Sequence, residues 1–273
     1  MTAVIDRLDT SSVPAEIIRI ISDIHYGDRA SRVLRLPQLR PLLEGVARLV
    51  LNGDTLDTRR ASDPAHTDAC RAEVMDFFPR EIEATTFLSG NHDADFSPLH
   101  SLDLAGGAVF VVHGDILFDN IVPWGRDAAL IGRRIAAEMR ALPPPARENL
   151  ENRLVIWRRA AASIPQRHQS ERNRLKYALR FAADTVWPLF RIFRILRAWH
   201  LEPGLAATLV RQHRPAAGFI TTGHTHRPGV WRTPAGIVVI NTGSFCPPLG
   251  GYALDLAPAC LTVRRVDCRA GEF

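Results

Sequence analysis

The sequence contains no uninterrupted apolar stretch long enough to cross a bilayer, so we expect no transmembrane helix. Its opening segment, MTAVIDRLDTSSVPAE, lacks a basic stretch followed by an apolar core, and we therefore expect no signal peptide. Cysteine is scarce, and the four cysteines form no C-x-x-C pair and no disulfide framework. These absences favour a soluble protein of a reducing compartment, with the cytoplasm as the expected location.

Lysine is almost absent, because Lys176 is the only one and arginine carries nearly all of the basic charge. The segment from Arg126 to Arg214 contains 18 basic and seven acidic residues, a net charge of +11, whereas the whole chain carries +5. Such asymmetry suggests that the middle segment faces an anionic partner. A well-solvated helical surface would have the same composition, and both interpretations stay open here.

Short apolar runs rich in β-branched residues are the main secondary-structure signal, and we expect each to form a buried strand. The runs are Ile17–Ile21, Leu49–Leu51, Thr85–Leu88, Val109–Val112, Phe219–Thr222, Ile237–Ile240, Tyr252–Leu256 and Leu261–Val266. Helical patterns at Pro37–Leu49 and Asp68–Glu83 separate the early runs, whereas the last runs follow one another directly. This order predicts an α/β protein with an antiparallel part.

The segment 124–214 has a different composition, rich in Ala, Arg and Leu, low in glycine and interrupted by prolines. We interpret it as several helices that form an inserted cap or lid. The chain length of 273 residues is compatible with one large domain that carries such an insertion. The expected organisation is therefore a core of residues 1–123 and 215–273, with the helical cap at 124–214.

Metal-binding residue types follow five of the predicted strands at the points where those strands end. The motifs are Asp23-x-His25, Gly53-Asp54-x-x-Asp57, Gly90-Asn91-His92-Asp93, His113-Gly114-Asp115 and Gly223-His224-Thr225-His226. In open α/β sheets, ligands bind at the carboxyl ends of the strands, because the loops there converge. A lone histidine is usually structural, but five of the ten histidines lie in these motifs. The pattern therefore favours one shared site.

The combination of imidazole and carboxylate groups without thiolate is typical of sites for Mn, Fe, Zn or Ni, and not of a structural zinc cage. Asp23 and His25 are separated by one residue, so in extended backbone their side chains point to the same side. The ligands are too many for one ion and about enough for two. A pair of metals can activate water and stabilise the transfer of a phosphoryl group.

The order of these five motifs resembles the calcineurin-like metallophosphoesterase superfamily. Within it, the chain looks most like the UDP-2,3-diacylglucosamine pyrophosphohydrolases of lipid A synthesis. That closer resemblance depends on the H-G-D motif, on G-H-T-H-R-P at Gly223–Pro228, and on a helical insertion between them. The best-known branch of those enzymes has arginine in place of His92. The resemblance implies a two-sheet α/β sandwich flanked by helices.

The resemblance also implies a role for each matching residue. Asp23, His25 and His226 would hold the first metal, and Asn91, His113 and His224 would hold the second. Asp54 would bridge the two ions. His92 would protonate the leaving oxygen or stabilise charge on the phosphoryl group, and Asp93 would orient His92 through a hydrogen bond. Asp57 would position a ligand or merely cap the following turn. The expected cofactors are two divalent cations, with manganese first and Fe, Zn or Ni as alternatives.

Arginines next to these motifs, namely Arg59, Arg60 and Arg227, are candidates for contact with substrate phosphate, because guanidinium donates two parallel hydrogen bonds. Residues 181–199 predict an amphipathic helix, with Arg191, Arg194 and Arg197, together with the preceding Arg180, on one side. The other side carries Leu189, Ile192, Phe193, Leu196 and Trp199. Such a helix can lie in an anionic membrane interface, close over an acyl chain, or pack on the main domain. Pro188 would kink or end it.

The leading hypothesis is hydrolysis of a phosphoanhydride or phosphodiester in a lipid-linked nucleotide, such as UDP-2,3-diacylglucosamine to lipid X and UMP. The expected partners are that phosphorylated substrate and the inner face of an anionic membrane. One alternative is a nucleotide or cyclic-nucleotide phosphodiesterase, or a nuclease whose basic segment binds nucleic acid. Another is a non-catalytic scaffold of the same fold. The sequence does not predict an oligomeric state.

Overall fold

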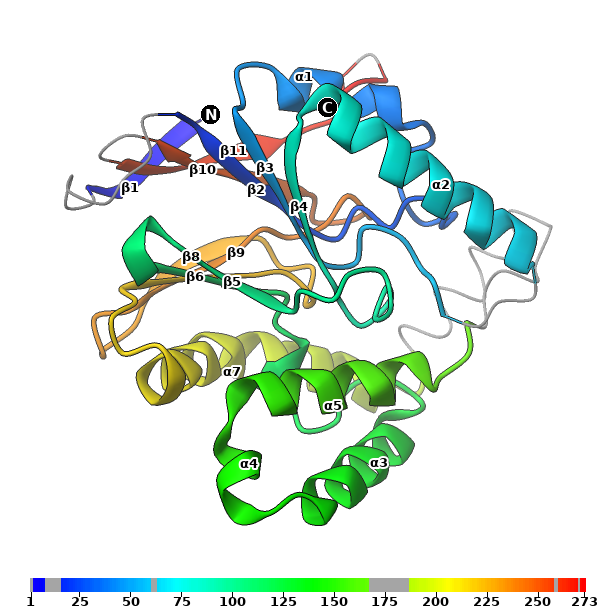
Figure 1. Ribbon diagram of the computed structural model, residues 1–273, viewed down its shortest axis with the longest axis vertical. Helices are drawn as coiled ribbons and strands as arrows, with labels where there is room; N and C mark the ends of the chain where they lie inside the picture. The colour runs from blue at the N-terminus through cyan, green and yellow to red at the C-terminus, as the bar shows by residue number, and fades with distance from the viewer. Residues whose placement is uncertain (1, 8–15, 60–62, 167–186, 258–259, 270) are drawn as a thin grey trace.

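The structure is a computed structural model that describes residues 2–7, 16–59, 63–166, 187–257, 260–269 and 271–273. Two β-sheets lie face to face, and helices cover the outer face of each sheet (Figure 1). This arrangement confirms the predicted two-sheet α/β sandwich flanked by helices. No helix in the described ranges is both long and apolar enough to cross a membrane.

The first sheet has six strands in the order β1-β11-β10-β2-β3-β4. Strands β2, β3 and β4 run parallel, whereas β10, β11 and β1 join the sheet antiparallel. The bounds are β1 Thr2–Arg7, β2 Ile18–Ile21, β3 Arg48–Asn52, β4 Ala84–Leu88, β10 Gly251–Ala257 and β11 Cys260–Val266. The sheet therefore joins the beginning and the end of the chain.

The second sheet has five strands in the order β5-β6-β7-β9-β8. Its three inner strands are parallel, and the edge strands β5 and β8 are antiparallel to their neighbours. The bounds are β5 Ser101–Leu104, β6 Val109–Val112, β7 Phe219–Thr222, β8 Gly229–Arg232 and β9 Val238–Asn241. All eight predicted strands occur. The prediction missed β1, β5 and β8, two of which are short edge strands with polar positions.

Three apolar cores separate the layers, and the strands supply them by strict alternation. In β6, Val109 and Val111 point into the core between the two sheets. Phe110 and Val112 point the other way, into the core beneath the second helical layer. The β3 residues Leu49 and Leu51 face the first helical layer. Both sheets are thus apolar on both faces, as the continuous apolar runs predicted.

Helices cover the outer face of the first sheet with η2 Leu36–Leu39, α1 Arg40–Leu43 and α2 Pro64–Glu81. The predicted helix at Asp68–Glu83 corresponds to α2, which begins earlier at Pro64 after its N-cap Asp63. The predicted helix at Pro37–Leu49 is wrong in extent. It ends at Leu43, because Gly45 adopts a left-handed φ of 69° and β3 begins at Arg48.

Helices from the segment 124–214 cover the outer face of the second sheet (Figure 1). They are α3 Ala128–Ala141, α4 Pro144–Glu148, α5 Leu150–Ala162 and α7 Phe190–His213, and η3 Ala105–Gly107 and η4 Asp115–Leu117 precede them. Leu154 and Trp157 of α5 and Val210 of α7 share one core with β6, β7 and β9. The helices are therefore a layer of the sandwich, and the domain boundaries at 123/124 and 214/215 stay predictions.

Replacing a core residue of this last layer tests the packing. Phe110 is completely buried beneath α5 and α7, so Phe110→Ala should lower the free energy of unfolding by about 3–5 kcal/mol, the usual loss for a buried phenylalanine. Phe193→Ala is the matched control, because that ring is 72% exposed. Chemical denaturation followed by circular dichroism measures both. Equal losses in the two variants would contradict the assigned core.

Candidate metal centre

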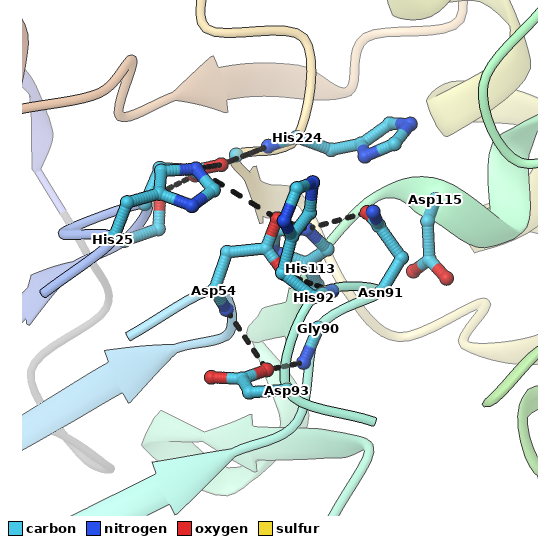
Figure 2. A network of polar contacts seen from close by, with 12 residues as sticks. His25, Asp54, Gly90, Asn91, His92, Asp93, His113, Asp115 and His224 are labelled. Atoms are coloured by element: carbon cyan, nitrogen blue, oxygen red, sulfur yellow. Dashed lines mark hydrogen bonds and ion pairs between the residues drawn. The ribbon is translucent and has the colours of Figure 1, made fainter. Parts of the chain in front are cut away.

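The predicted ligands come together where five strands end, three in the first sheet and two in the second (Figure 2). Asp23 and His25 follow β2, Asp54 follows β3, and Asn91 and His92 follow β4. His113 follows β6, and His224 and His226 follow β7. The centre therefore lies at the edge where the two sheets meet, and neither sheet could build it alone.

One group of side chains combines Asp23, His25 and His226. Asp23 Oδ1 lies 3.2 Å from His226 Nε2 and 3.8 Å from His25 Nε2, and the two Nε2 atoms are 3.1 Å apart. All three donor atoms lie within 4.8 Å of one another, a spacing that allows them to share one ion. This is the set of residues that the motifs predicted for a first metal.

A second group adjoins the first through Asp54. Asp54 Oδ2 is 3.9 Å from His25 Nε2 and 3.3 Å from His113 Nε2, so this carboxylate lies between the two groups. Asn91 Oδ1 lies 3.3 Å from His113 Nε2 on the far side. Asp54 and His113 also form a group with Asp23 in which the donor atoms lie within 4.8 Å of one another.

Two histidines are fixed in a single tautomer by backbone carbonyl groups, which can only accept hydrogen bonds. His113 donates from Nδ1 to the carbonyl of Asn52 at 3.0 Å, which leaves Nε2 free to bind an ion. His224 donates from Nε2 to the carbonyl of Ile121 at 2.9 Å, which leaves Nδ1. The His224 ring lies 5.4 Å from that of His113 and packs against Trp124 at 5.7 Å.

The backbone around the centre is held in an uncommon conformation. Seven non-glycine residues of the described chain have positive φ, and five of them are predicted ligands: Asp23, His25, Asp54, His224 and His226. Left-handed backbone is unfavourable for residues with a Cβ atom and gathers at functional sites, where the surrounding structure enforces it. Ile121, whose carbonyl receives the His224 proton, is a sixth. The strain therefore marks the same loops as the motifs.

Two motif glycines are required because ligand side chains occupy the space of a Cβ atom. A Cβ at Gly90 would collide with the carboxylate and the amide of Asp54. A Cβ at Gly223 would collide with the Asp23 carboxylate and the Ser22 hydroxyl. The loops can thus approach one another only with glycine at these positions.

The buried carboxylates create a strong local demand for positive charge. Burial lowers the pKa of His25, but hydrogen bonding to Asp23 and the charge of Asp54 raise it to about 9. Burial likewise opposes protonation of His113, and Asp54 and Asp23 raise its pKa to about 10. Burial raises the pKa of Asp54, yet the imidazoles, His113 first, hold it well below its usual range. A divalent cation would satisfy the same demand.

His92 is oriented by Asp57 and not by Asp93, so the predicted role of Asp93 is wrong. The Nδ1 atom of His92 lies 3.0 Å from Asp57 Oδ2. Arg59 holds Asp57 in place with bonds of 2.6 and 3.0 Å, and its guanidinium is 2.9 Å from His92 Nδ1. Of the two roles left open for Asp57, positioning a functional side chain is the one that the contacts support.

Asp93 points away from His92 because it accepts hydrogen bonds from three backbone amides (Figure 2). These are the amides of Asp54 at 3.1 Å, Thr55 at 2.7 Å and Gly90 at 2.5 Å. Burial and the charge of Asp54 raise the pKa of Asp93 to about 7, although the amide bonds favour the carboxylate. Asp93 therefore joins the β3 and β4 loops to each other.

The other two candidate arginines differ from Arg59 in their placement. Arg60 lies outside the described residues. Arg227 lies over Trp199 and Trp231, with its Cζ atom 5.7 and 5.1 Å from the ring centroids. Its Nη1 donates to the Trp199 carbonyl at 3.0 Å, which Pro203 leaves without a helical partner because proline lacks an amide proton. Phosphate binding by Arg227 stays a prediction.

Sequence reasoning missed Glu202, a fully buried carboxylate that α7 brings to the β7 loop. It accepts hydrogen bonds from Thr222 at 2.9 Å, Thr225 at 2.7 Å and Asn241 at 2.6 Å. Trp199, one turn earlier, donates from Nε1 to the Thr225 carbonyl at 3.0 Å. Nothing in a helical segment rich in charged residues distinguishes Glu202 before the fold is known.

Arg158 of α5 has a similar supporting role for the loops that carry Asn91 and His113. This buried guanidinium pairs with Asp115 and donates from Nε to the Ser89 hydroxyl at 2.9 Å. Ser89 and Asp115 belong to the loops that carry Asn91 and His113. The helical layer thus holds the ligand loops through two buried side chains, Arg158 and Glu202.

The sequence model of one protein family, described as calcineurin-like phosphoesterase, matches residues 18–228. No curated protein matched the sequence. Among solved structures, a dimetal phosphatase from Danio rerio is 16% identical with a TM-score of 0.44, and the match covers 92% of this chain and 96% of that chain.

Two further structures are similar in the same range. A metallophosphoesterase from Sphaerobacter thermophilus is 14% identical with a TM-score of 0.39, over 94% of this chain and 90% of that chain. Vps29 complexed with Zn²⁺ from Entamoeba histolytica is 12% identical with a TM-score of 0.37, over 93% and 99% of the two chains.

Removing Glu202 should weaken metal binding without any change to a ligand. Glu202→Ala deprives Thr222, Thr225 and Asn241 of their shared acceptor, and loss of such supporting bonds lowers metal affinity by about 10–100-fold. Glu202→Gln should retain most of the affinity, because the amide oxygen still accepts. Titration with Mn²⁺ in a calorimeter measures the effect.

The control for this titration is Glu138→Ala, a variant of a partly exposed glutamate on α3. It should bind metal as the unmodified protein does. Unchanged affinity in Glu202→Ala, or equal loss in Glu202→Ala and Glu138→Ala, would contradict the supporting role of Glu202.

Proposed function

The chain belongs to the calcineurin-like phosphoesterase family, and we propose that it is a metal-dependent phosphoesterase that hydrolyses a phosphoanhydride or a phosphodiester. The observation that carries the proposal is the convergence of carboxylate, imidazole and carboxamide groups from five strand ends on one buried centre. The His92–Asp57 pair beside that centre supplies a proton-transferring group. Ligands and proton donor are thus present together.

The residues fit two divalent cations. The donor atoms of Asp23, His25 and His226 lie close enough together to share one ion, as do those of Asp23, Asp54 and His113. The same carboxylates raise the pKa of His25 and of His113, an effect that shows how strongly the centre attracts positive charge. Asp23, His25 and His226 would hold one ion, and Asn91, His113 and His224 the other, with Asp54 shared. When bound, such a pair activates water and neutralises phosphoryl charge. We propose manganese, although the donor set also accepts Fe, Zn or Ni.

His92 supplies the proton for the leaving oxygen in the proposed reaction. Asp57 accepts the hydrogen bond from Nδ1–H, so Nε2 carries the proton for the leaving oxygen when the ring is doubly protonated. The ring is partly exposed and lies edge-on to His25, with 4.9 Å between centroids, so it borders the centre without belonging to the predicted ligands. Asp57 and Arg59 keep the ring in this orientation.

Arg59 is the predicted substrate arginine with the best placement for a phosphoryl group. Its guanidinium adjoins His92 and is 18% exposed, so it can meet an anion at the mouth of the site while it holds Asp57. A planar guanidinium has enough donors for both contacts. We therefore propose that Arg59 both orients the proton donor and contacts the phosphate.

For the substrate, we propose a nucleotide diphosphate linked to a lipid, with UDP-2,3-diacylglucosamine as the first compound to test. The support is the resemblance of the H-G-D and G-H-T-H-R-P motifs and the helical segment between them. A nucleotide phosphodiesterase would use the same centre with a smaller substrate. A non-catalytic scaffold would not need the Asp57–His92–Arg59 arrangement, which favours an enzyme.

The direct test is hydrolysis by the full chain loaded with Mn²⁺. We expect release of UMP from UDP-2,3-diacylglucosamine and much slower release by Asp54→Asn, which removes the shared carboxylate. Intact substrate together with turnover of bis(p-nitrophenyl) phosphate would reject the lipid nucleotide and keep the phosphoesterase. No turnover of either compound, with no metal bound after reconstitution, would reject the enzyme and favour the scaffold.

Asp57→Asn separates the new assignment from the predicted one. Loss of the carboxylate frees His92, so kcat should fall by about 10²-fold, within the usual range for acid–base catalysis, while metal content stays at the level of the unmodified protein. Asp93→Asn should instead disturb the amides of Asp54 and Gly90 and lower metal content. Kinetics and elemental analysis of both variants check this. The reverse pattern would restore Asp93 as the partner of His92.

A further inference from the structure

The first half of α7 exposes its apolar side chains. Phe193 is 72% exposed, Leu189 just before the helix is 58% exposed, and Trp187 is 66% exposed. Phe190, Ile192 and Leu196 are also among the exposed large hydrophobic residues. No other described segment gathers so many of them. Exposed apolar patches of this kind are typical of surfaces that bind another protein, a membrane or a ligand.

Helical spacing places most of these side chains on one face. Leu189, Ile192, Phe193 and Leu196 follow one another at intervals of three, one and three residues, and so share one side of the helix. Arg191 lies on the opposite side, where it is buried against the domain. The predicted grouping of Arg191 with Arg194 and Arg197 is therefore wrong, because Arg191 faces the protein.

The two remaining arginines border the apolar face. Arg194 and Arg197 are exposed, and the Arg194 guanidinium lies 4.6 Å from the centre of the Phe190 ring. The surface thus combines aromatic and aliphatic side chains with two cations at its edge. An apolar face bordered by cations is typical of helices that lie in a membrane interface, although protein interfaces are also enriched in aromatic residues and arginine.

We propose that this α7 face, formed by Trp187, Leu189, Phe190, Ile192, Phe193, Leu196, Arg194 and Arg197, binds the surface of a membrane that contains anionic lipid. The apolar side chains would enter the boundary between headgroups and acyl chains, and the arginines would contact lipid phosphates. The charge of the 126–214 segment, +11, has the sign that such a surface attracts.

The α7 face is connected to the metal centre through Trp199. Trp199, one turn after Leu196, donates to the carbonyl of Thr225, which stands between His224 and His226. A membrane bound to the α7 face would therefore lie close to the ligand loop. Given the proposed function, on which this step rests, the substrate class is a phosphate ester or anhydride carried by an amphiphile in that membrane.

The test is sedimentation of the metal-loaded full chain with lipid vesicles. We expect binding to vesicles of phosphatidylcholine with phosphatidylglycerol and weaker binding to phosphatidylcholine alone. Phe193→Glu should lower the bound fraction by about tenfold or more, because it places a carboxylate in the headgroup layer of anionic lipid. Leu34→Glu is the matched control. Leu34 is 65% exposed, and its neighbours Val33 and Leu36 belong to the core beneath the first helical layer, far along the chain from α7. This variant should bind vesicles as the unmodified protein does.

A second pair of changes tests the arginines. Arg194→Gln combined with Arg197→Gln should remove the preference for anionic vesicles while leaving binding to neutral vesicles unchanged. Absence of vesicle binding by the unmodified protein would overturn the proposal. So would a dimer in solution that Phe193→Glu converts to a monomer without any change in vesicle binding, because a second copy would then cover the face.

The outcomes for membrane binding and for activity are separable. Phe193 is 72% exposed and is not among the residues of the metal centre, so Phe193→Glu should hydrolyse the water-soluble bis(p-nitrophenyl) phosphate at the rate of the unmodified protein. Vesicle binding without any phosphoesterase activity would reject the proposed function and keep the membrane surface. Activity on the soluble ester with no vesicle binding would do the opposite.

Discussion

The structure depends on the compensation of two buried negative charges, those of the Asp23 and Asp54 carboxylates. Each is almost completely shielded from water and each faces several imidazoles. Charge of this density in an apolar interior is unfavourable unless cations compensate it. The structure therefore brings histidines from opposite sheets to the same point, and the sandwich is the means by which distant loops reach one another.

The helical layer both packs on the second sheet and supports the loops that carry the ligands. Its apolar face completes the core of the second sheet, and two ionic groups pass from it toward the ligand loops. Arg158 joins the loops of β4 and β6, while Glu202 joins β7 to β9. Buried polar groups of this kind are tolerated because each has several hydrogen-bond partners. The geometry of the ligands is thus secured from both sides.

The candidate ligands could be located in the sequence because their motifs each follow a short apolar strand, and the structure brings those strand ends together. The strands themselves were recognisable because both of their faces are buried, which gives continuous apolar runs. The edge strands β5 and β8 were missed because each has only four residues and includes a charged one, Asp103 in β5 and Arg232 in β8. Asp57 and Asp93 could not be distinguished, since the direction of a side chain in an irregular loop depends on contacts that adjacent residues do not reveal.

The orientation of Arg191 escaped prediction for a related reason. Helical periodicity tells which residues share a side, but not which side the protein will cover. The usual assumption that the apolar side is the covered one fails in the first half of α7. A buried arginine and an exposed phenylalanine only two residues apart are the kind of conflict between pattern and packing that is expected at a functional surface.

Pro203 divides α7 into two stretches with different attachments. The stretch after it is packed into the core through Ala206 and Val210, whereas the stretch before it exposes most of its large apolar side chains to solvent. Since proline interrupts the hydrogen-bond ladder, the helix is most easily bent near this residue. Trp199 and Glu202, which bind the β7 loop, lie at that joint. A displacement of the outer stretch of α7 would therefore be transmitted through Trp199 and Glu202 to the loop that carries His224 and His226.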